Sequence, residues 1–123
     1  MERSQPLVRP KRGEVYRVSF DPTVGAEITK TRPALVVQND VGNRHSPITI
    51  VAAITSRFDD RLYPTEVALI PPEGGLREPS VVLLNQIRSV DKRRLTAKLG
   101  RLSKESMERV DRALLVSLGL VEL

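Results

Sequence analysis

The sequence predicts one mainly β domain, a compact antiparallel barrel or sandwich that ends in an α-helix. Short runs rich in β-branched residues recur along the chain, with turn-forming residues between them. No long helical pattern separates these runs, and helical periodicity is found only near the C-terminal end. The 123 residues have the length of a single domain with its own core. We therefore expect one domain over residues 1–123, with residues 1–10 as a flexible N-terminal extension.

The first strand is expected at residues 13–20, because Tyr16, Val18 and Phe20 alternate there with residues of the opposite face. Two later runs are almost wholly apolar, which is typical of strands that are buried on both sides. Turn formers bound each run, so neighbouring strands are expected to be antiparallel. The other expected strands are residues 33–38, 48–55, 65–70, 80–89 and 96–102.

The C-terminal helix is expected to begin after Ser103, whose side chain suits the N-cap position, with Glu105 in the first turn. Gly119 is expected to stop the helix. An apolar stripe of this kind belongs more often to a core than to a partner groove, so the helix should pack onto the sheet. The stripe consists of Met107, Val110, Leu114 and Leu118.

The chain carries 20 Lys and Arg residues against 15 Asp and Glu residues, which gives a net charge of +5. This excess favours a polyanionic partner, although a well-solvated basic surface explains the charge as well. The densest basic run is expected to be a solvated rim, with phosphate contact as the alternative. It contains Arg88, Lys92, Arg93, Arg94 and Lys98, with Asp91 as the one acid.

Several kinds of chemistry are disfavoured by the residues that the chain lacks. It has no cysteine, one histidine (His45), and neither an H-E-x-x-H nor a P-loop spacing, so we expect no metal and no cofactor. His45 is most simply a loop residue, with direct catalysis as the alternative. The longest apolar run, Ile50–Ile54, is far too short to span a membrane, and no apolar leader follows the N-terminal cations. A cytoplasmic protein without membrane contact is expected.

Arginine chemistry remains as the strongest candidate. The connection from Asp21 to Arg32 is long for a hairpin, and such loops are commonly functional. Pro33 forces an extended backbone on Arg32, whose guanidinium is a rigid fork that matches phosphate oxygens. Thr55 ends a later strand, and its hydroxyl would reach the same phosphate if the two strands pair. The alternative is structural: Arg32 pairs with Glu27 or another acid, and Thr55 caps a strand.

Four stretches of the chain, taken in order, resemble the MazF/PemK family of bacterial toxin endoribonucleases. They are "KRGEVYRVSFDPTVGAEITKTRPALVVQNDVGNRHSP", "IVAAITS", "LYPTEVAL" and "VVLLNQIRSVDKRRL". The likeness runs from about Lys11 to Leu120. It implies a homodimer of small SH3-like barrels that cleaves single-stranded RNA without metal or ribosome, leaving a cyclic phosphate and a free 5′ hydroxyl. It also implies a co-expressed antitoxin whose acidic tail covers the basic groove.

The resemblance also implies roles for particular residues. The family's catalytic arginine and threonine match Arg32 and Thr55, and Glu27 matches a glutamate that assists proton transfer or holds the arginine. Asn85 stands where many relatives have an acid, and His45 where relatives often have Tyr or Phe. The residues expected to bind RNA are Lys30, Thr31, Ser56, Pro64, Thr65 and Gln86.

Two other functions are compatible with the same barrel. A topoisomerase poison would use the end of the C-terminal helix to bind its protein target, although "SLGLVEL" lacks the tryptophan expected there. A non-catalytic nucleic-acid binder would associate with RNA in a salt-dependent manner and leave it intact.

Overall fold

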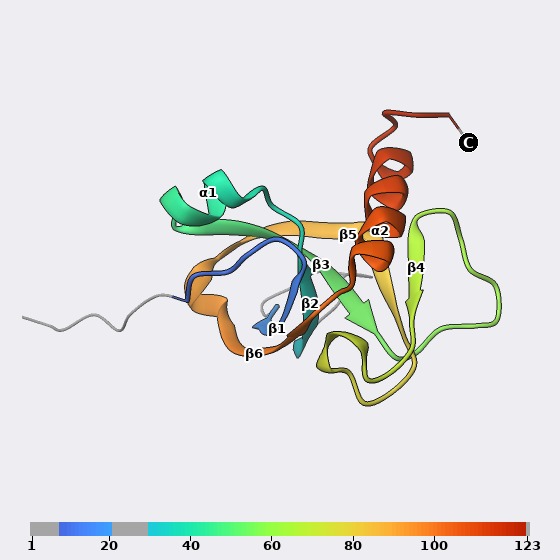
Figure 1. Cartoon of the computed structure of the whole chain (residues 1–123), viewed down its shortest axis with the longest axis horizontal. Coiled ribbons are helices and arrows are strands. Elements are labelled where there is room, and N and C mark those ends of the chain that lie inside the picture. The colour runs from blue at the N-terminus through green and yellow to red at the C-terminus, as the bar shows by residue number, and fades with distance from the viewer. Residues whose placement is uncertain (1–7, 21–29, 123) are drawn as a thin grey trace, which may run out of the picture.

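The computed structural model describes residues 8–20 and 30–122, which form one curled antiparallel sheet with a helix packed on it (Figure 1). The strand order is β4-β5-β3-β2-β1-β6, and in the described part no pairing joins β6 back to β4. The predicted class, an antiparallel barrel-like sheet with a C-terminal helix, is confirmed, although the sheet is not closed. The elements are β1 (Glu14–Ser19), β2 (Thr31–Val36), α1 (Asp40–His45), β3 (Ile48–Thr55), β4 (Glu66–Leu69), η1 (Glu73–Gly75), β5 (Ser80–Asp91), η2 (Lys92–Arg94), β6 (Leu95–Arg101) and α2 (Lys104–Ser117).

All six expected strands are present, with small changes at their ends. β2 starts two residues earlier than expected and ends at Val36, because Val37 and Gln38 both donate their backbone N–H groups to the carbonyl of Ile50. Two donors on one acceptor break the regular ladder, so the chain leaves the sheet there. Thr31 and Arg32 therefore belong to the strand itself.

Apolar side chains are buried on both faces of the sheet, as strand alternation requires. One face packs against α2, where Val110 and Ala113 meet the sheet residues Val15, Leu35 and Ile54. The opposite, concave face holds a second apolar cluster. Its fully buried members include Val18, Phe20, Val36, Val51 and Val81.

The C-terminal helix forms as the sequence predicts. The Ser103 hydroxyl accepts a hydrogen bond from the Ser106 N–H at 3.1 Å, and Gly119 follows the helix with a φ of 71°. Leu118 departs from the expected stripe, because it is the C-cap residue and its side chain is 56% exposed. No helix in the described residues is long and apolar enough to cross a bilayer.

Residues 40–45 were expected to be loop but form the short helix α1. The Asn39 side chain caps it by accepting a hydrogen bond from the Gly42 N–H at 2.8 Å. Asn43 is the buried residue of α1, and its side chain accepts a hydrogen bond from the Thr49 hydroxyl at 2.7 Å. The interpretation of His45 as a loop residue is therefore wrong, since it occupies the last helical position.

The basic run is not a uniformly solvated rim. Arg88 lies 5.7 Å from the centre of the Phe20 ring and donates to the Phe20 carbonyl, which places it on the concave face. Lys92 is only 6% exposed. Arg93, by contrast, pairs with Asp91 at the surface as expected. The prediction fails at Arg88 because β5 continues to Asp91 and holds Arg88 against Phe20. It fails at Lys92 because this residue begins η2 and its ammonium group donates to the Asn43 carbonyl in α1.

The β4–β5 connection crosses over β6 at very close range. A Cβ atom added at Gly75 would lie 1.9 Å from the Leu99 carbonyl oxygen, and one added at Gly100 would lie 2.7 Å from the Gly74 carbonyl carbon. Gly75 also has a φ of 72°, a conformation that favours glycine. The glycines of this connection therefore allow it to rest directly on the backbone of β6.

Candidate functional site

Arg32 and Thr55 lie on neighbouring strands, near the start of β2 and at the end of β3. These strands are antiparallel, and Ala34 lies opposite Ala53. Continuing the same register by two residues places Arg32 opposite Thr55. Since strand side chains alternate between faces, both residues point toward the concave face of the sheet, like Ala34 and Ala53.

The Thr55 hydroxyl has local hydrogen bonds. It accepts from the Arg57 N–H at 3.0 Å and donates to the Arg57 carbonyl at 3.3 Å, and the residue is only 8% exposed. The second distance is long for an O–H···O bond, so little is lost when that donor turns to another acceptor. The hydroxyl thus closes a turn at the end of β3, and one rotation would free its proton.

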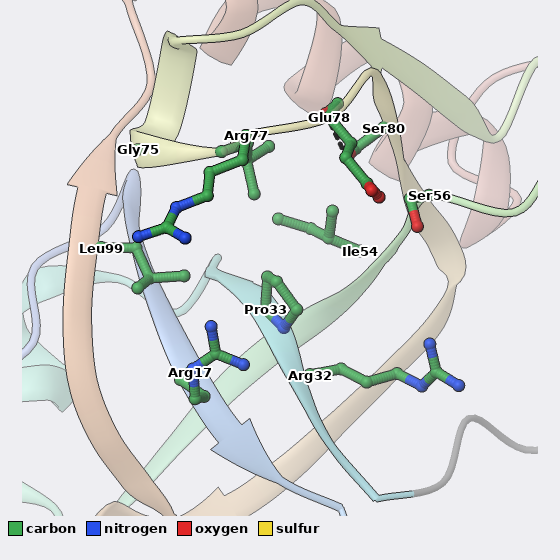
Figure 2. A pocket seen from close by; sticks show the side chains of 11 residues that line it. Arg17, Arg32, Pro33, Ile54, Ser56, Gly75, Arg77, Glu78, Ser80 and Leu99 are labelled. Carbon is green, nitrogen blue, oxygen red and sulfur yellow. Dashed lines mark hydrogen bonds between the residues drawn. The ribbon is translucent and has the colours of Figure 1, made fainter.

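A pocket of about 420 Å³ is lined by Arg32 and by Ser56, the residue after Thr55 (Figure 2). Its other strand residues, Arg17, Pro33 and Ile54, alternate in step with Val15 and Leu35 and so lie on the face that packs against α2, opposite to the face of Thr55. Its base is apolar and includes Pro33 and Ile54, while its polar lining comes from several elements. In Figure 2 the guanidinium groups of Arg17 and Arg77 lie on one side of Pro33, and the side chain of Arg32 extends from β2 away from both of them. The polar and charged lining residues are Arg17, Arg32, Ser56, Arg77, Glu78 and Ser80.

Among the described lining residues three arginines stand against one glutamate, which gives an excess of positive charge, and the apolar base beneath them suits a planar group attached to an anion. A nucleotide unit of RNA has this combination of base and phosphate. The pocket wall is also held in place: the Ser80 hydroxyl donates to the Glu78 carbonyl at 2.9 Å, and the glycine contacts fix the same connection on β6. Arg77 is therefore presented from a firmly packed loop.

A large irregularity in β5 positions Asn85 and Gln86. Ala53 pairs with Leu83, but the next residue of β3, Ala52, pairs with Ile87, so residues 84–86 are left outside the ladder. Gln86 is two residues from Arg88, so its side chain points to the same, concave face of the sheet. Gln86 is half-buried. Asn85 is exposed.

The residues expected to bind RNA fall into two groups. Lys30, Thr31 and Ser56 lie with Arg32 and Thr55 at the start of β2 and the end of β3. Pro64 and Thr65 precede β4 and lie beside the β5 irregularity, since the Leu84 N–H donates to the Thr65 carbonyl at 2.9 Å. Gln86 belongs to this second group.

Lys30 has a special backbone position at the mouth of the first group. It adopts a φ of 65°, and its carbonyl accepts the Phe20 N–H at 3.0 Å, which fixes the base of the connection between β1 and β2. Glu27, which the resemblance implies as a catalytic assistant, lies outside the described residues.

Sequence reasoning missed four of the polar and charged lining residues: Arg17, Arg77, Glu78 and Ser80. Arg17 had a detectable signal, because it is a cation at an alternating position of the first strand, opposite Pro33. Arg77 and Glu78 follow the "GG" of the β4–β5 connection, and only the close packing on β6 brings them to the pocket. No cluster of three or more possible metal ligands occurs within residues 8–20 and 30–122.

Residues 11–118 match the family described as "PemK-like, MazF-like toxin of type II toxin-antitoxin system". The match covers both strands that carry Arg32 and Thr55, the β5 irregularity and all of α2. The chain belongs to the PemK/MazF toxin family.

Individual members of the PemK/MazF family agree with this assignment. The chain is 48% identical over 112 residues to Endoribonuclease EndoA of Bacillus subtilis (strain 168), which covers 91% of this chain and 97% of that protein. Its fold is similar to a crystal structure of MazF from Deinococcus radiodurans, with a TM-score of 0.78 at 30% identity over 91% of this chain and 98% of the other. It is also similar to a mycobacterial endoribonuclease solved in complex with its cognate antitoxin, with a TM-score of 0.77 at 29% identity over 93% and 99% of the two chains.

Proposed function

We propose that this chain is a cytoplasmic endoribonuclease toxin that cleaves single-stranded RNA at short sequences, without metal or ribosome, and is neutralised by an antitoxin. The observation that carries the proposal is the position of Arg32 and Thr55 at the same end of the neighbouring strands β2 and β3, with Arg32 also lining a pocket whose described residues include two further arginines. Family membership and the endoribonuclease relatives support the reaction class.

In the proposed reaction the ribose 2′ oxygen attacks the adjacent phosphorus. The new O2′–P bond forms as the P–O5′ bond breaks, so the products are a 2′,3′-cyclic phosphate and a 5′ hydroxyl. The 2′ hydroxyl loses its proton to a base, and the departing 5′ oxygen gains one. All bonds are exchanged within RNA, so the protein needs to supply only positioning, proton transfer and charge stabilisation.

Arg32 is the residue that we propose to stabilise the additional charge on the phosphorane oxygens. A guanidinium retains its charge at all working pH values and presents paired donors to two oxygens. Pro33 and the β2–β1 ladder hold its backbone, with Val18 directly opposite, so little reorganisation is needed during the reaction. The hydroxyl of Thr55 would turn from the Arg57 carbonyl and donate to the same phosphate.

We assign proton transfer, or the positioning of Arg32, to Glu27, and RNA contacts to the two groups of residues described above. Asn85 has no acid–base role in this proposal, because a carboxamide does not titrate in this range. A Glu27→Gln variant that keeps RNA affinity but loses its dependence on pH between about 4 and 7 would support the acid–base role. An unchanged pH profile would leave Glu27 with positioning alone.

The decisive experiment compares the wild-type chain with Arg32→Ala and Arg32→Lys on a long RNA in the presence of EDTA and without ribosomes. We expect discrete cuts with 5′ hydroxyl ends in the wild type, and a loss of about 10²–10³-fold in cleavage rate in both variants. Mapping of the 5′ and 3′ ends identifies the chemistry. Cleavage that survives in Arg32→Ala would refute the assignment of Arg32, and intact RNA despite binding would indicate the non-catalytic alternative. Intact RNA with stalled topoisomerase would indicate the poison.

We further propose that the active form is a homodimer and that an acidic antitoxin covers the basic surface. The 13.7 kDa chain should therefore sediment at about twice its mass. A chain that is monomeric at concentrations that support cleavage would contradict the proposed homodimer. The net charge of +5 and the complex of a similar endoribonuclease with its antitoxin support the second.

A further inference from the structure

A second pocket, of about 1070 Å³, lies at the α1 end of the sheet. It is far from Arg32 and Thr55: α1 connects the end of β2 to the start of β3, whereas Arg32 is near the start of β2 and Thr55 ends β3. The eight residues of β3 span roughly 25 Å, which separates the two sites. We call this cavity the α1 pocket; it is lined by α1, residues 8–11 and Lys92.

Lys92 is the unusual residue of the α1 pocket. It is 94% buried, by its 6% exposure, yet within residues 8–20 and 30–122 its Nζ has one hydrogen-bond partner, the carbonyl oxygen of Asn43. An ammonium group has three N–H donors, so two remain for other acceptors. Among the residues that the structure describes, no carboxylate forms an ion pair with Lys92. A buried cation of this kind is costly unless an anion or further acceptors reach it.

The rest of the pocket lining strengthens the positive charge. Arg9, Lys11 and Arg44 are exposed at its rim. Among the described lining residues Asp40 is the one carboxylate, and it is already engaged: it accepts hydrogen bonds from the Arg12 N–H at 2.8 Å and the Asn43 side-chain amide at 3.1 Å. Asp40 therefore offsets only part of the charge of the four basic side chains described in this lining.

We propose that the α1 pocket binds a phosphate group, with the Lys92 ammonium at its base and the rim cations around it. A phosphate offers several oxygens and up to two negative charges, which matches the number of donors better than a single carboxylate does. The buried lysine gives the pocket a fixed donor, and the exposed side chains of Lys11 and Arg44 can close around a ligand. This site is separate from the proposed catalytic residues.

The phosphate could come from an RNA strand that extends along the protein or from a small phosphate compound. The binding chemistry is the same in both cases, and competition distinguishes them. If the site holds a strand, a 2′-deoxy oligonucleotide will displace inorganic pyrophosphate from the pocket. If the site holds a small compound, pyrophosphate and a mononucleotide will bind but the oligonucleotide will not displace them. Both results support a phosphate site.

The test titrates inorganic pyrophosphate into the full-length Arg32→Ala chain, which removes phosphate binding at the catalytic arginine, and follows backbone amide signals by NMR. We expect saturable shifts in the amides of α1 and of Lys92. The double variant Lys11→Gln/Arg44→Gln should weaken binding about tenfold or more, because two charge-assisted contacts are removed. Lys104→Gln, an exposed cation on α2, is the matched control and should leave the affinity unchanged.

Lys92→Met keeps the length of the side chain without its charge and should abolish the shifts. Because Lys92 also supports the end of α1, the surface double variant provides the test if the Lys92 variant fails to fold. The proposal is overturned if pyrophosphate does not shift the α1 signals, if Lys11→Gln/Arg44→Gln binds as tightly as its parent, or if acetate at equal ionic strength gives the same shifts. None of these measurements depends on RNA cleavage.

Discussion

At the scale of single residues, the Thr55 hydroxyl determines whether the end of β3 is only a structural turn or part of a reactive site. A Thr55→Val variant keeps the shape of the side chain and removes the donor. We expect its RNA cleavage rate to fall about 10–100-fold, because one hydrogen bond to a charged phosphate is lost. Thr55→Ser, which keeps the hydroxyl, should retain most of the activity. Single-turnover cleavage at saturating RNA measures both, and full activity in Thr55→Val would leave Thr55 with its capping role alone.

A second residue-scale feature links β1 to β6 through the Glu14 carboxylate. It forms an ion pair with the Lys98 ammonium at 2.7 Å and accepts hydrogen bonds from the Lys11 N–H and the Tyr16 hydroxyl. Burial acts to raise the pKa of Glu14, but these hydrogen bonds and the Lys98 charge outweigh it, so the pKa lies below the usual 4.5. Burial, together with the neighbouring Glu14 charge, raises the pKa of Tyr16 to about 12.

The lowered pKa of Glu14 makes a definite prediction about stability and pH. A carboxyl group whose pKa is lower in the folded state stabilises the fold above its unfolded pKa, and this contribution is lost as pH falls through the folded value. Glu14→Gln should therefore lower the free energy of unfolding by about 1–3 kcal/mol at pH 7 and by much less at pH 3. Urea unfolding at the two pH values measures this. The exposed Glu108→Gln serves as the control, and an equal loss from Glu14→Gln at both pH values would contradict the assignment.

At the scale of elements, the β4–β5 connection depends on glycine for its position. Gly75→Ala brings a methyl group into the Leu99 carbonyl and also forces alanine to a φ of 72°. We expect a loss of about 2–4 kcal/mol in unfolding free energy, together with weaker RNA binding, because Arg77 is displaced with the loop.

Gly119→Ala is the matched control for Gly75→Ala. Gly119 has nearly the same φ, 71°, but no atom lies within 4 Å of an added Cβ. Gly119→Ala should lower the free energy of unfolding only by the cost of placing alanine at a positive φ, about 1–2 kcal/mol, and should leave RNA binding unchanged. Equal losses at the two glycines in chemical denaturation would show that the contact with β6 does not matter.

The elements that the sequence predicted are those with strong local signals. The six strands and α2 follow from alternating or helical apolar patterns and from the Ser103 cap, and each has its own stretch of buried residues. α1 was missed because its six residues include Gly42 and show no apolar stripe. Its stability comes from Asn39, from Asn43 and from Lys92, which lies 49 residues beyond Asn43, and only the folded chain brings these groups together.

The candidate site was predictable to a similar extent. The resemblance and the rigid position before Pro33 pointed to Arg32, and the pairing of two predicted strands brought Thr55 opposite it. Arg17 and Arg77 were not predicted, because their meeting depends on a register and on a close backbone contact that leave no local pattern in the sequence. Burial of Lys92 was likewise hidden, since a lysine within a basic run resembles a surface residue.

At the scale of the whole molecule, the net charge of +5 should govern RNA association. For a single strand, each phosphate contact contributes about 0.7 to the slope of log K against log salt concentration. In the Arg32→Ala background, replacing Arg17 and Arg77 by glutamine should therefore reduce that slope by about 1.4. Fluorescence anisotropy with a labelled RNA at several salt concentrations measures it. Replacing the exposed α2 cations Lys104 and Arg112 should have no such effect, and an equal reduction there would mean that the pocket has no special role.

The crossing of β6 by the β4–β5 connection has one more consequence. β6 ends the sheet and pairs only with β1, so its other side would offer unpaired backbone groups to any passing chain. Gly74 and Gly75 lie directly against Leu99 and Gly100 and obstruct that approach. The contact that shapes the pocket thus also protects against strand addition between molecules. A chain whose connection is lifted from β6 should form aggregates more readily on storage, and light scattering over time would detect them.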